Sequence, residues 1–278
     1  TALNLTEGRP VKLILLFAIP VFLGNLFQIC YSLVDTKIVG RILGETALAA
    51  VGSVSILYTL LTGFFNGLSL GFSVLTARFY GSGEEKKLKE NVAVALALGF
   101  LTAAVVITAV AVFIRPILSL LNVPPQQMDM ALSYITLLVW GMFVTLAYNL
   151  CANTLRAIGD SLTPLVFLVI AALTNVALDY LFILVFGMGV RGAAVATLVS
   201  QLLSVALCLI RIRHGFPILH IAREHFVFSR DRVVSLYQSG LSMGLMSSLV
   251  NFGSLVLQSG INQLGTNIIV AHTAARRR

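Results

Sequence analysis

The stretch that decides the fold is SLTPLVFLVIAALTNVALDYLFILVFGMGV, residues 161–190, in which Asp179 is the one charged side chain. About 20 apolar residues suffice to cross the hydrocarbon core of a bilayer. An ionisable side chain inside such a run costs about 2.5–3.5 kcal/mol on insertion scales, so it needs a partner or a purpose. Asn175 lies one helical turn before Asp179, on the same face. The stretch therefore predicts a membrane helix with a buried proton or cation site.

The rest of the chain has the same character, since 58% of its residues are hydrophobic and 11% are charged. A soluble domain has about 25% charged residues. Because backbone polar groups must be satisfied internally in lipid, the apolar runs predict helices and an all-α integral membrane protein. The predicted helices are 11–39, 47–77, 91–114, 130–155, 164–187, 192–213 and 233–260, with an eighth beginning after the Gly265-Thr266-Asn267 turn.

The net charge of +8 does not indicate a nucleic-acid partner, because the basic residues lie in loops between apolar runs. Their distribution follows the rule that cytoplasmic loops are richer in Lys and Arg, and it predicts a cytoplasmic N-terminus. With that orientation the cytoplasmic segments hold Arg9, Lys12, Arg78, Lys86, Lys87, Lys89, Arg156, Arg211, Arg213, Arg223, Arg230 and Arg232, and the external segments hold Lys37, Arg41, Arg115 and Arg191.

A faint internal repeat suggests two lobes. Leu43-Gly44-Glu45-Thr46 and Leu264-Gly265-Thr266-Asn267 both follow a long apolar run, and many transporters are built from such repeats. We therefore expect a piece of a twelve-helix protein, with a six-helix lobe over 1–213, a cytoplasmic linker over 214–232 and the start of a second lobe over 233–278. The alternative is a complete seven-helix protein with a basic tail.

The first predicted helix carries a polar stripe made of Asn25, Gln28, Ser32 and Asp35. Their spacing places them within about 80° of one face, which predicts that they face a bundle interior or a water-filled cavity. Pro20 lies in the same helix and removes a backbone hydrogen bond there, so it is a candidate hinge. Asp35 ends its apolar run, and a surface position at the membrane interface is the alternative for it.

Helix depth predicts a site shared by three helices. Asp179 is 15 residues past Pro164, or about 22 Å along the helix. Thr197 lies near the start of the next helix, with Gln201 one turn deeper, and Asp35 is near the end of the first. These oxygen ligands suit Na⁺ or a proton, because two carboxylates brought together cannot both be ionised at low cost.

Other polar and small residues allow two interpretations. Tyr31, Tyr148 and Asn149 are candidates for lining a substrate cavity, where aromatic rings can contact a cation. Asn153 and Ser69 are more typical of hydrogen bonds between helices, and Gly63, Gly67 and Gly71 of close helix packing. The chain has no nucleophile–base motif, phosphate-binding loop or cysteine–histidine metal spacing, so we expect neither an enzyme nor a bound cofactor or metal other than Na⁺.

At this point the chain resembles the multidrug and toxic compound extrusion (MATE) family, through several short segments in the family's order. These are Val34-Asp35-Thr36 with Val39-Gly40-Arg41 and Leu43-Gly44; Ala77-Arg78-Phe79-Tyr80-Gly81; Leu155-Arg156-Ala157-Ile158-Gly159-Asp160 with Pro164; Asn175 with Asp179-Tyr180; and Gly189-Val190 with Gly192-Ala193-Ala194.

The resemblance implies a two-lobe antiporter in a bacterial or archaeal plasma membrane, acting as a monomer. It would export organic cations, drugs or toxic metabolites in exchange for H⁺ or Na⁺. By similarity Asp35, Asn175, Asp179 and Thr197 form the ion site and Pro20 is the bending point of the first helix. Two alternatives stay open: a lipid-linked saccharide flippase of related fold, and a seven-helix receptor or channel.

Overall fold

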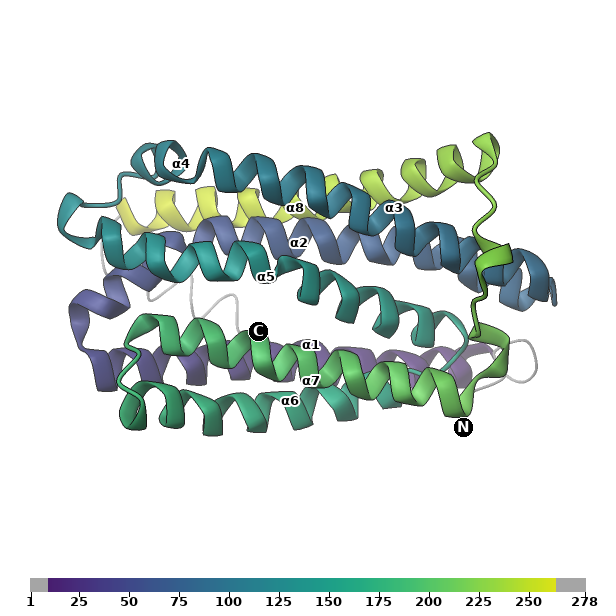
Figure 1. Ribbon diagram of the computed structural model, residues 1–278, viewed down its shortest axis with the longest axis horizontal. Helices are drawn as coiled ribbons and strands as arrows, with labels where there is room; N and C mark the ends of the chain where they lie inside the picture. Colours follow the sequence, from purple (N-terminus) through teal and green to yellow (C-terminus); the bar gives the residue numbers. More distant parts are fainter. Residues whose placement is uncertain (1–9, 264–278) are drawn as a thin grey trace.

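The computed structural model describes residues 10–263, and seven of the helices in this part are long and apolar enough to cross a membrane. They lie together as one bundle (Figure 1). This confirms the predicted all-α membrane fold; the expected eighth helix falls in 264–278, outside the described residues. The seven are α1 (Pro10–Leu43), α2 (Glu45–Gly81), α3 (Glu85–Val112), α5 (Pro125–Ala157), α6 (Leu162–Tyr180), α7 (Val190–Gly215) and α8 (Arg230–Gln263).

Several helices extend beyond the apolar runs that predicted them. The start of α3 was expected at residue 91, but the helix begins at Glu85, and Lys89 pairs with Glu85 one turn away at 2.6 Å. Such i,i+4 pairs support a helix that has left the hydrocarbon region. Four short elements complete the fold: α4 (Ile114–Leu120), the π-helix η1 (Leu181–Val185) that continues α6, and the 3₁₀ turns η2 (Pro217–Leu219) and η3 (Arg223–His225).

A single residue, Gly44, joins α1 to α2. Its φ of +85° lies in the left-handed region that glycine adopts without steric cost. The chain therefore turns sharply between the two helices, at the left-hand end of the bundle in Figure 1. Gly40, one turn earlier, lets α2 approach closely, because a Cβ atom on it would lie 3.1 Å from the Leu48 side chain.

Helix α8 packs against α2 through small residues, as the glycine spacing predicted. Gly63, Gly67 and Gly71 form one face of α2 and meet the face of α8 that carries Gly240 and Gly244. A Cβ atom on Gly71 would overlap the Ser239 carbonyl oxygen, and one on Gly67 would lie 2.8 Å from the Gly244 Cα atom. Because lipid gives no hydrophobic drive to associate helices, close backbone approach of this kind supplies the attraction.

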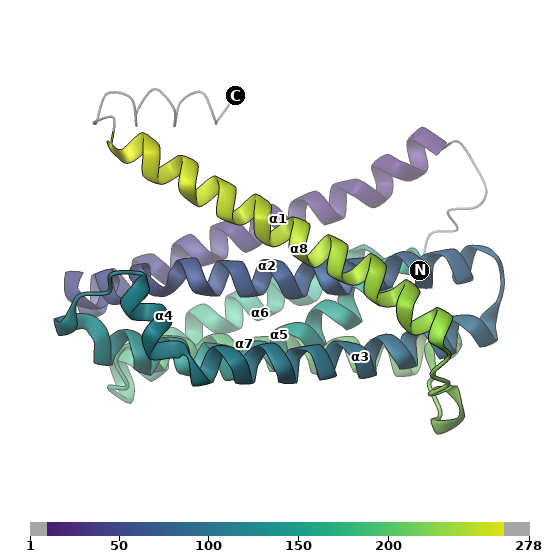
Figure 2. The same cartoon turned by 90° about the horizontal axis from the view of Figure 1, so that it is seen from above.

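Polar contacts also tie α8 to α3. Arg232 forms an ion pair with Glu90, and both side chains are largely shielded from solvent. Further along, the hydroxyls of Tyr237 and Thr102 are 3.2 Å apart. In Figure 2 α8 crosses over α2 and α3. The segment beyond the expected linker is thus attached to the first six membrane helices, while its assignment to a second lobe stays a prediction.

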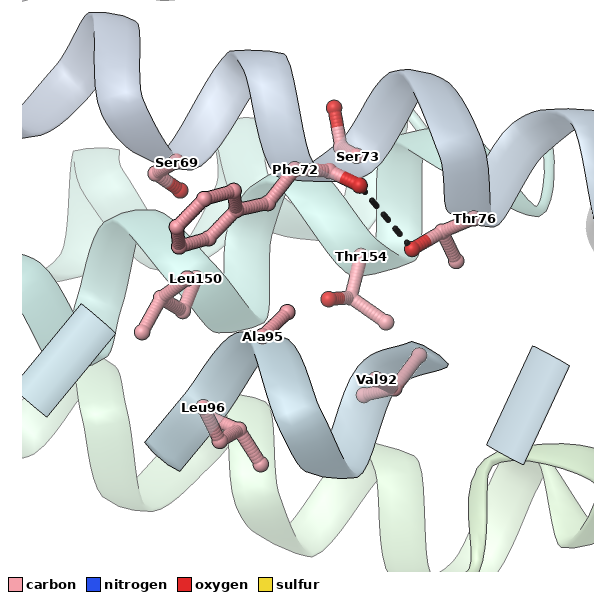
Figure 3. A pocket seen from close by; sticks show the side chains of 9 residues that line it. All are labelled: Ser69, Phe72, Ser73, Thr76, Val92, Ala95, Leu96, Leu150 and Thr154. Atoms are coloured by element: carbon pink, nitrogen blue, oxygen red, sulfur yellow. Dashed lines mark hydrogen bonds between the residues drawn. The ribbon is translucent and has the colours of Figure 1, made fainter. Parts of the chain in front are cut away.

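Hydrogen bonds between buried side chains join α2 to α3 and α5. Asn153 donates to Ser69 Oγ at 3.0 Å, which confirms that this pair bonds between helices, and Asn91 donates to Thr76 Oγ1 at 3.0 Å. A small cavity of about 10 Å³ lies beside them, which is space for about one water molecule. Figure 3 shows its lining, with the Thr76 hydroxyl directed at the Phe72 carbonyl.

The glycine face predicts how alanine substitutions on α2 will differ. We expect Gly71→Ala to lower the stability of the protein by about 1–3 kcal/mol, because backbone atoms of α8 cannot yield to the new methyl group. Gly52→Ala is the matched control, since Gly52 lies on α2 with open space around its Cα atom. Thermal unfolding in detergent, followed by circular dichroism, measures both. Equal midpoints for the two variants would mean that α8 does not pack closely on α2.

Candidate functional site

The site begins on α6, where Asn175 and Asp179 are fully buried and share one face, one turn apart. The opposing helix, α7, brings Thr197, which is 7% exposed. Asn175 Nδ2 donates to Thr197 Oγ1 at 3.4 Å. Asp179 is therefore buried inside the bundle, and Asn175, one turn before it, contacts Thr197. Helices α1, α6 and α7 lie side by side (Figure 1).

The Thr197 hydroxyl connects three helices. It accepts hydrogen bonds from Asn175 on α6 and from the Tyr31 hydroxyl on α1, at 3.4 Å, and it donates to the Ala193 carbonyl at 3.0 Å. A hydroxyl has one proton to donate and two lone pairs to accept. Thr197 therefore uses its full hydrogen-bonding capacity to hold α1 against α6 and α7.

Asp35 on α1 completes the site. Its side chain lies within hydrogen-bonding reach of the Asp179 carboxyl group, so the two groups can share a hydrogen bond once one of them holds a proton. Asp35 as a whole is half-buried, and its Oδ1 atom is buried. Two carboxyl groups from different helices thus meet in the interior of the bundle.

Four buried oxygens without hydrogen-bond donors gather at this site. Within the described residues, Asp35 Oδ1, Asn175 Oδ1 and both carboxylate oxygens of Asp179 are buried and lack a partner. Leaving such a group unpaired costs about 1–3 kcal/mol, and more when it is charged. All four atoms are hydrogen-bond acceptors. The arrangement is therefore chemically suited to a proton or a hard cation, and not to a ligand that brings acceptor atoms of its own.

Two tyrosines near the pair were not predicted from the sequence. Tyr58 on α2 and Tyr134 on α5 both lie within electrostatic range of Asp35, and Tyr134 is 7% exposed. A tyrosine in an apolar run is equally typical of packing or of the membrane interface. For Tyr134 the sequence holds one indication, its depth along the helix. It lies nine residues after Pro125, where α5 begins.

Gln201 lies one turn deeper than Thr197 on α7, as expected. Its Oε1 atom accepts a hydrogen bond from Thr145 on α5 at 2.7 Å, and its side chain also reaches Tyr58 on α2. Gln201 therefore joins α7 to α2 and α5 beneath the carboxyl pair. The structure gives it bonding partners within the bundle, and a substrate contact for it stays a prediction.

The other candidates differ in their burial. Asn25, Gln28 and Ser32 on α1 are exposed, and Asn149 on α5 is half-buried. Tyr148 lies 14 residues after Tyr134 on α5, or about 21 Å along the helix, and its hydroxyl donates to the Pro164 carbonyl. Tyr148 is thus separated from the carboxyl pair by the helical rise, and its contact with a substrate stays a prediction.

Pro20 is buried in the first half of α1, and the helix continues through it. Gly24, one turn later, faces Leu165 and Leu168 on α6. The residue four positions before a helical proline keeps an unpaired carbonyl, which weakens the helix at that point. A hinge at Pro20 is compatible with this geometry and stays a prediction.

Comparisons with known proteins place these features in a wider group. The MatE family model matches residues 20–181, more than half of the chain. The chain is 30% identical over 264 residues to the probable multidrug resistance protein YoeA of Bacillus subtilis, covering 92% of this chain and 57% of YoeA. It is 28% identical to an FAD transporter of Shewanella oneidensis, covering 96% of this chain and 57% of that protein.

A solved structure agrees with the family match. The crystal structure of MATE in the bent conformation superposes with a TM-score of 0.87 at 25% identity, covering all of this chain and 63% of that one. The chain thus spans somewhat more than half the length of the proteins that it matches.

The bonding at Thr197 predicts different outcomes for two substitutions. We expect Thr197→Val, which keeps the shape and removes the hydroxyl, to lower stability by about 1–3 kcal/mol, because the Asn175 amide and the Tyr31 hydroxyl lose their acceptor. Thr197→Ser keeps the hydroxyl and should restore most of that loss. Thermal unfolding of the purified protein in detergent measures the difference. A valine variant as stable as the serine variant would show that Thr197 does not join the three helices.

Proposed function

The chain belongs to the MatE family, and on this basis we propose that it forms the first part of a secondary antiporter that exports small organic molecules in exchange for H⁺ or Na⁺. In this proposal residues 1–213 are the first six-helix lobe, 214–232 a cytoplasmic linker and 233–278 the start of a second lobe. Transporters of this kind perform no covalent chemistry, so no catalytic residue or organic cofactor is assigned.

One observation carries the proposal: the carboxyl groups of Asp35 and Asp179 meet inside the bundle among buried oxygens that have no donor. Two adjacent carboxylates repel each other, and a shared proton or a bound cation removes that repulsion. Na⁺ is a hard cation for which carboxylate, amide and hydroxyl oxygens are suitable ligands. Asp35, Asn175, Asp179 and Thr197 would supply these.

The binding of H⁺ or Na⁺ would be coupled to the position of α1. Asp35 and Tyr31 are the polar contacts of this helix with α6 and α7 at the site, so a change of charge on Asp35 changes how α1 is held. A ligand shifts a conformational equilibrium only through its different affinity for the two states. Bending at Pro20 would be the motion that follows, and it would displace the substrate.

The proposed substrate is cationic or amphipathic. The groups near the carboxyl pair are tyrosines, an asparagine and a threonine, which can contact a cation through aromatic faces and oxygen atoms. An anionic cargo, such as a lipid-linked saccharide or the FAD that names one relative, would call for basic side chains there. A receptor or channel is not favoured, because the matched relatives are named for drug resistance and transport.

Transport assays on the full-length protein test the ion site. We expect Asp179→Asn to lower the initial rate of gradient-driven efflux of a fluorescent organic cation by about tenfold or more, equivalent to about 1.4 kcal/mol of activation free energy. The reason is that an amide cannot gain and lose a charge. Asp129→Asn is the matched control, since Asp129 is an exposed carboxylate near the start of α5. Unchanged ion-dependent efflux in Asp179→Asn would contradict the assignment.

Proteoliposomes with an imposed pH gradient alone or Na⁺ gradient alone identify the coupling ion. Under the proposal, one of the two gradients drives efflux in the wild-type protein and in Asp129→Asn, and that gradient drives it at least about tenfold more slowly in Asp179→Asn and Asp35→Asn. Efflux that requires ATP and ignores both gradients would overturn the antiport mechanism.

We propose that the protein is a monomer in the plasma membrane with a cytoplasmic N-terminus, because the basic residues of the loops gather on that side. An epitope tag at the N-terminus is then expected to bind antibody only after the cells are permeabilised. A tag between α1 and α2, next to Gly44, serves as the control and should bind antibody in intact cells. The reverse pattern would contradict the orientation.

A further inference from the structure

An open groove lies at the corner where α1 turns into α2, on the surface of the bundle. Its volume is about 480 Å³. One face of α1 supplies most of the lining, and α2 supplies one apolar side chain from its first turn. The lining residues are Leu33, Thr36, Lys37, Gly40, Arg41 and Leu48.

The groove is positively charged. Lys37 and Arg41 are exposed and lie one helical turn apart on the same face of α1. Neither takes part in any of the ion pairs found within residues 10–263. The nearest acidic residues in the sequence are Asp35, which points to Asp179 inside the bundle, and Glu45 at the start of α2. The two cations are therefore free to bind an anion.

The position of the groove along α1 matches the headgroup layer of a bilayer. Lys12 and Lys37 are the basic residues at the two ends of the apolar run of this helix, 25 residues apart. At 1.5 Å per residue this is about 37 Å, compared with about 30 Å for the hydrocarbon core and 40–45 Å with headgroups included. A helix α1 that spans the bilayer with Lys12 and Lys37 in opposite headgroup layers places Lys37 at phosphate level and Leu33 one turn nearer the acyl chains.

We propose that this groove binds the headgroup phosphate of an anionic phospholipid such as phosphatidylglycerol. The Lys37 ammonium and the Arg41 guanidinium donate to the phosphate oxygens, and Leu33 and Leu48 contact the glycerol and the first acyl carbons. Basic clusters at a membrane surface attract anionic lipids in this way. The basic end of the groove matches the charged headgroup of the phospholipid, and its apolar end matches the start of the acyl chains.

The inference does not depend on transport, because it concerns binding without an ion gradient. The purified full-length protein is titrated with phosphatidylglycerol in detergent, and bound lipid is counted by native mass spectrometry. We expect Lys37→Gln/Arg41→Gln to weaken the affinity for phosphatidylglycerol by about tenfold. Phosphatidylcholine should bind to the wild-type protein more weakly than phosphatidylglycerol does. Its affinity should be nearly the same for the wild type and for this variant.

The chain offers a matched control. Arg115 and Arg191 are exposed basic residues at the same end of the bundle, outside the groove, as the positions of α4 and the α6–α7 connection in Figure 1 show. Arg115→Gln/Arg191→Gln removes the same charge and should change the affinity by less than about twofold. The charge-preserving Lys37→Arg variant should bind like the wild type.

Three results would overturn the proposal. One is equal loss of binding in the two double variants, which would indicate a general effect of net charge. Another is binding of glycerol 3-phosphate as tight as that of the lipid, which would indicate a site for a soluble phosphate. The third is a wild-type protein with no preference for phosphatidylglycerol over phosphatidylcholine, as expected if other parts of the protein cover the groove. Circular dichroism of each variant verifies that the helices are retained.

Discussion

A carboxylate inside a membrane bundle has to be neutralised or paired, and the arrangement of α1, α6 and α7 is organised around that constraint. Asp179 has no exposed surface, and both of its carboxylate oxygens lack a hydrogen-bond donor within the described residues. The partner that α1 brings is a second carboxyl group, Asp35, rather than a lysine or an arginine. Such a pair is stable only with a positive charge between its members, which links ion binding to the contact between two helices.

Small side chains decide how closely the helices can come together around this site. Lipid tails are as apolar as leucine, so helix association in a membrane depends on close packing and on hydrogen bonds between helices. The glycine faces of α2 and α8 supply the first, and pairs such as Asn153 with Ser69 supply the second. Together these contacts hold α2 against α5 and α8.

Helix α1 connects the ion site to the membrane surface. At about 100° per residue, Lys37 and Arg41 lie about 200° and 240° around the helix from Asp35. One side of the same helical end therefore faces Asp179, and the other faces the groove proposed for a phospholipid. A lipid held there would restrain the end of the helix whose charge changes during ion binding, so the lipid and the ion would act on one element.

By itself the sequence determined local features. It predicted the seven membrane helices, it predicted close helix packing from the spacing of Gly63, Gly67 and Gly71, and it placed Asn175 and Asp179 on one face of their helix. These follow from hydropathy and from helical periodicity, which depend only on neighbouring residues. Depth along each helix also predicted a site shared by Asp35, Asp179 and Thr197, and the structure brings Asp35 beside Asp179 and Thr197 beside Asn175. Only the tertiary structure decided which faces meet. It placed Tyr58 and Tyr134 near the carboxyl pair and left Asn25, Gln28 and Ser32 exposed, because the rotation of one helix against another is set by packing across the bundle.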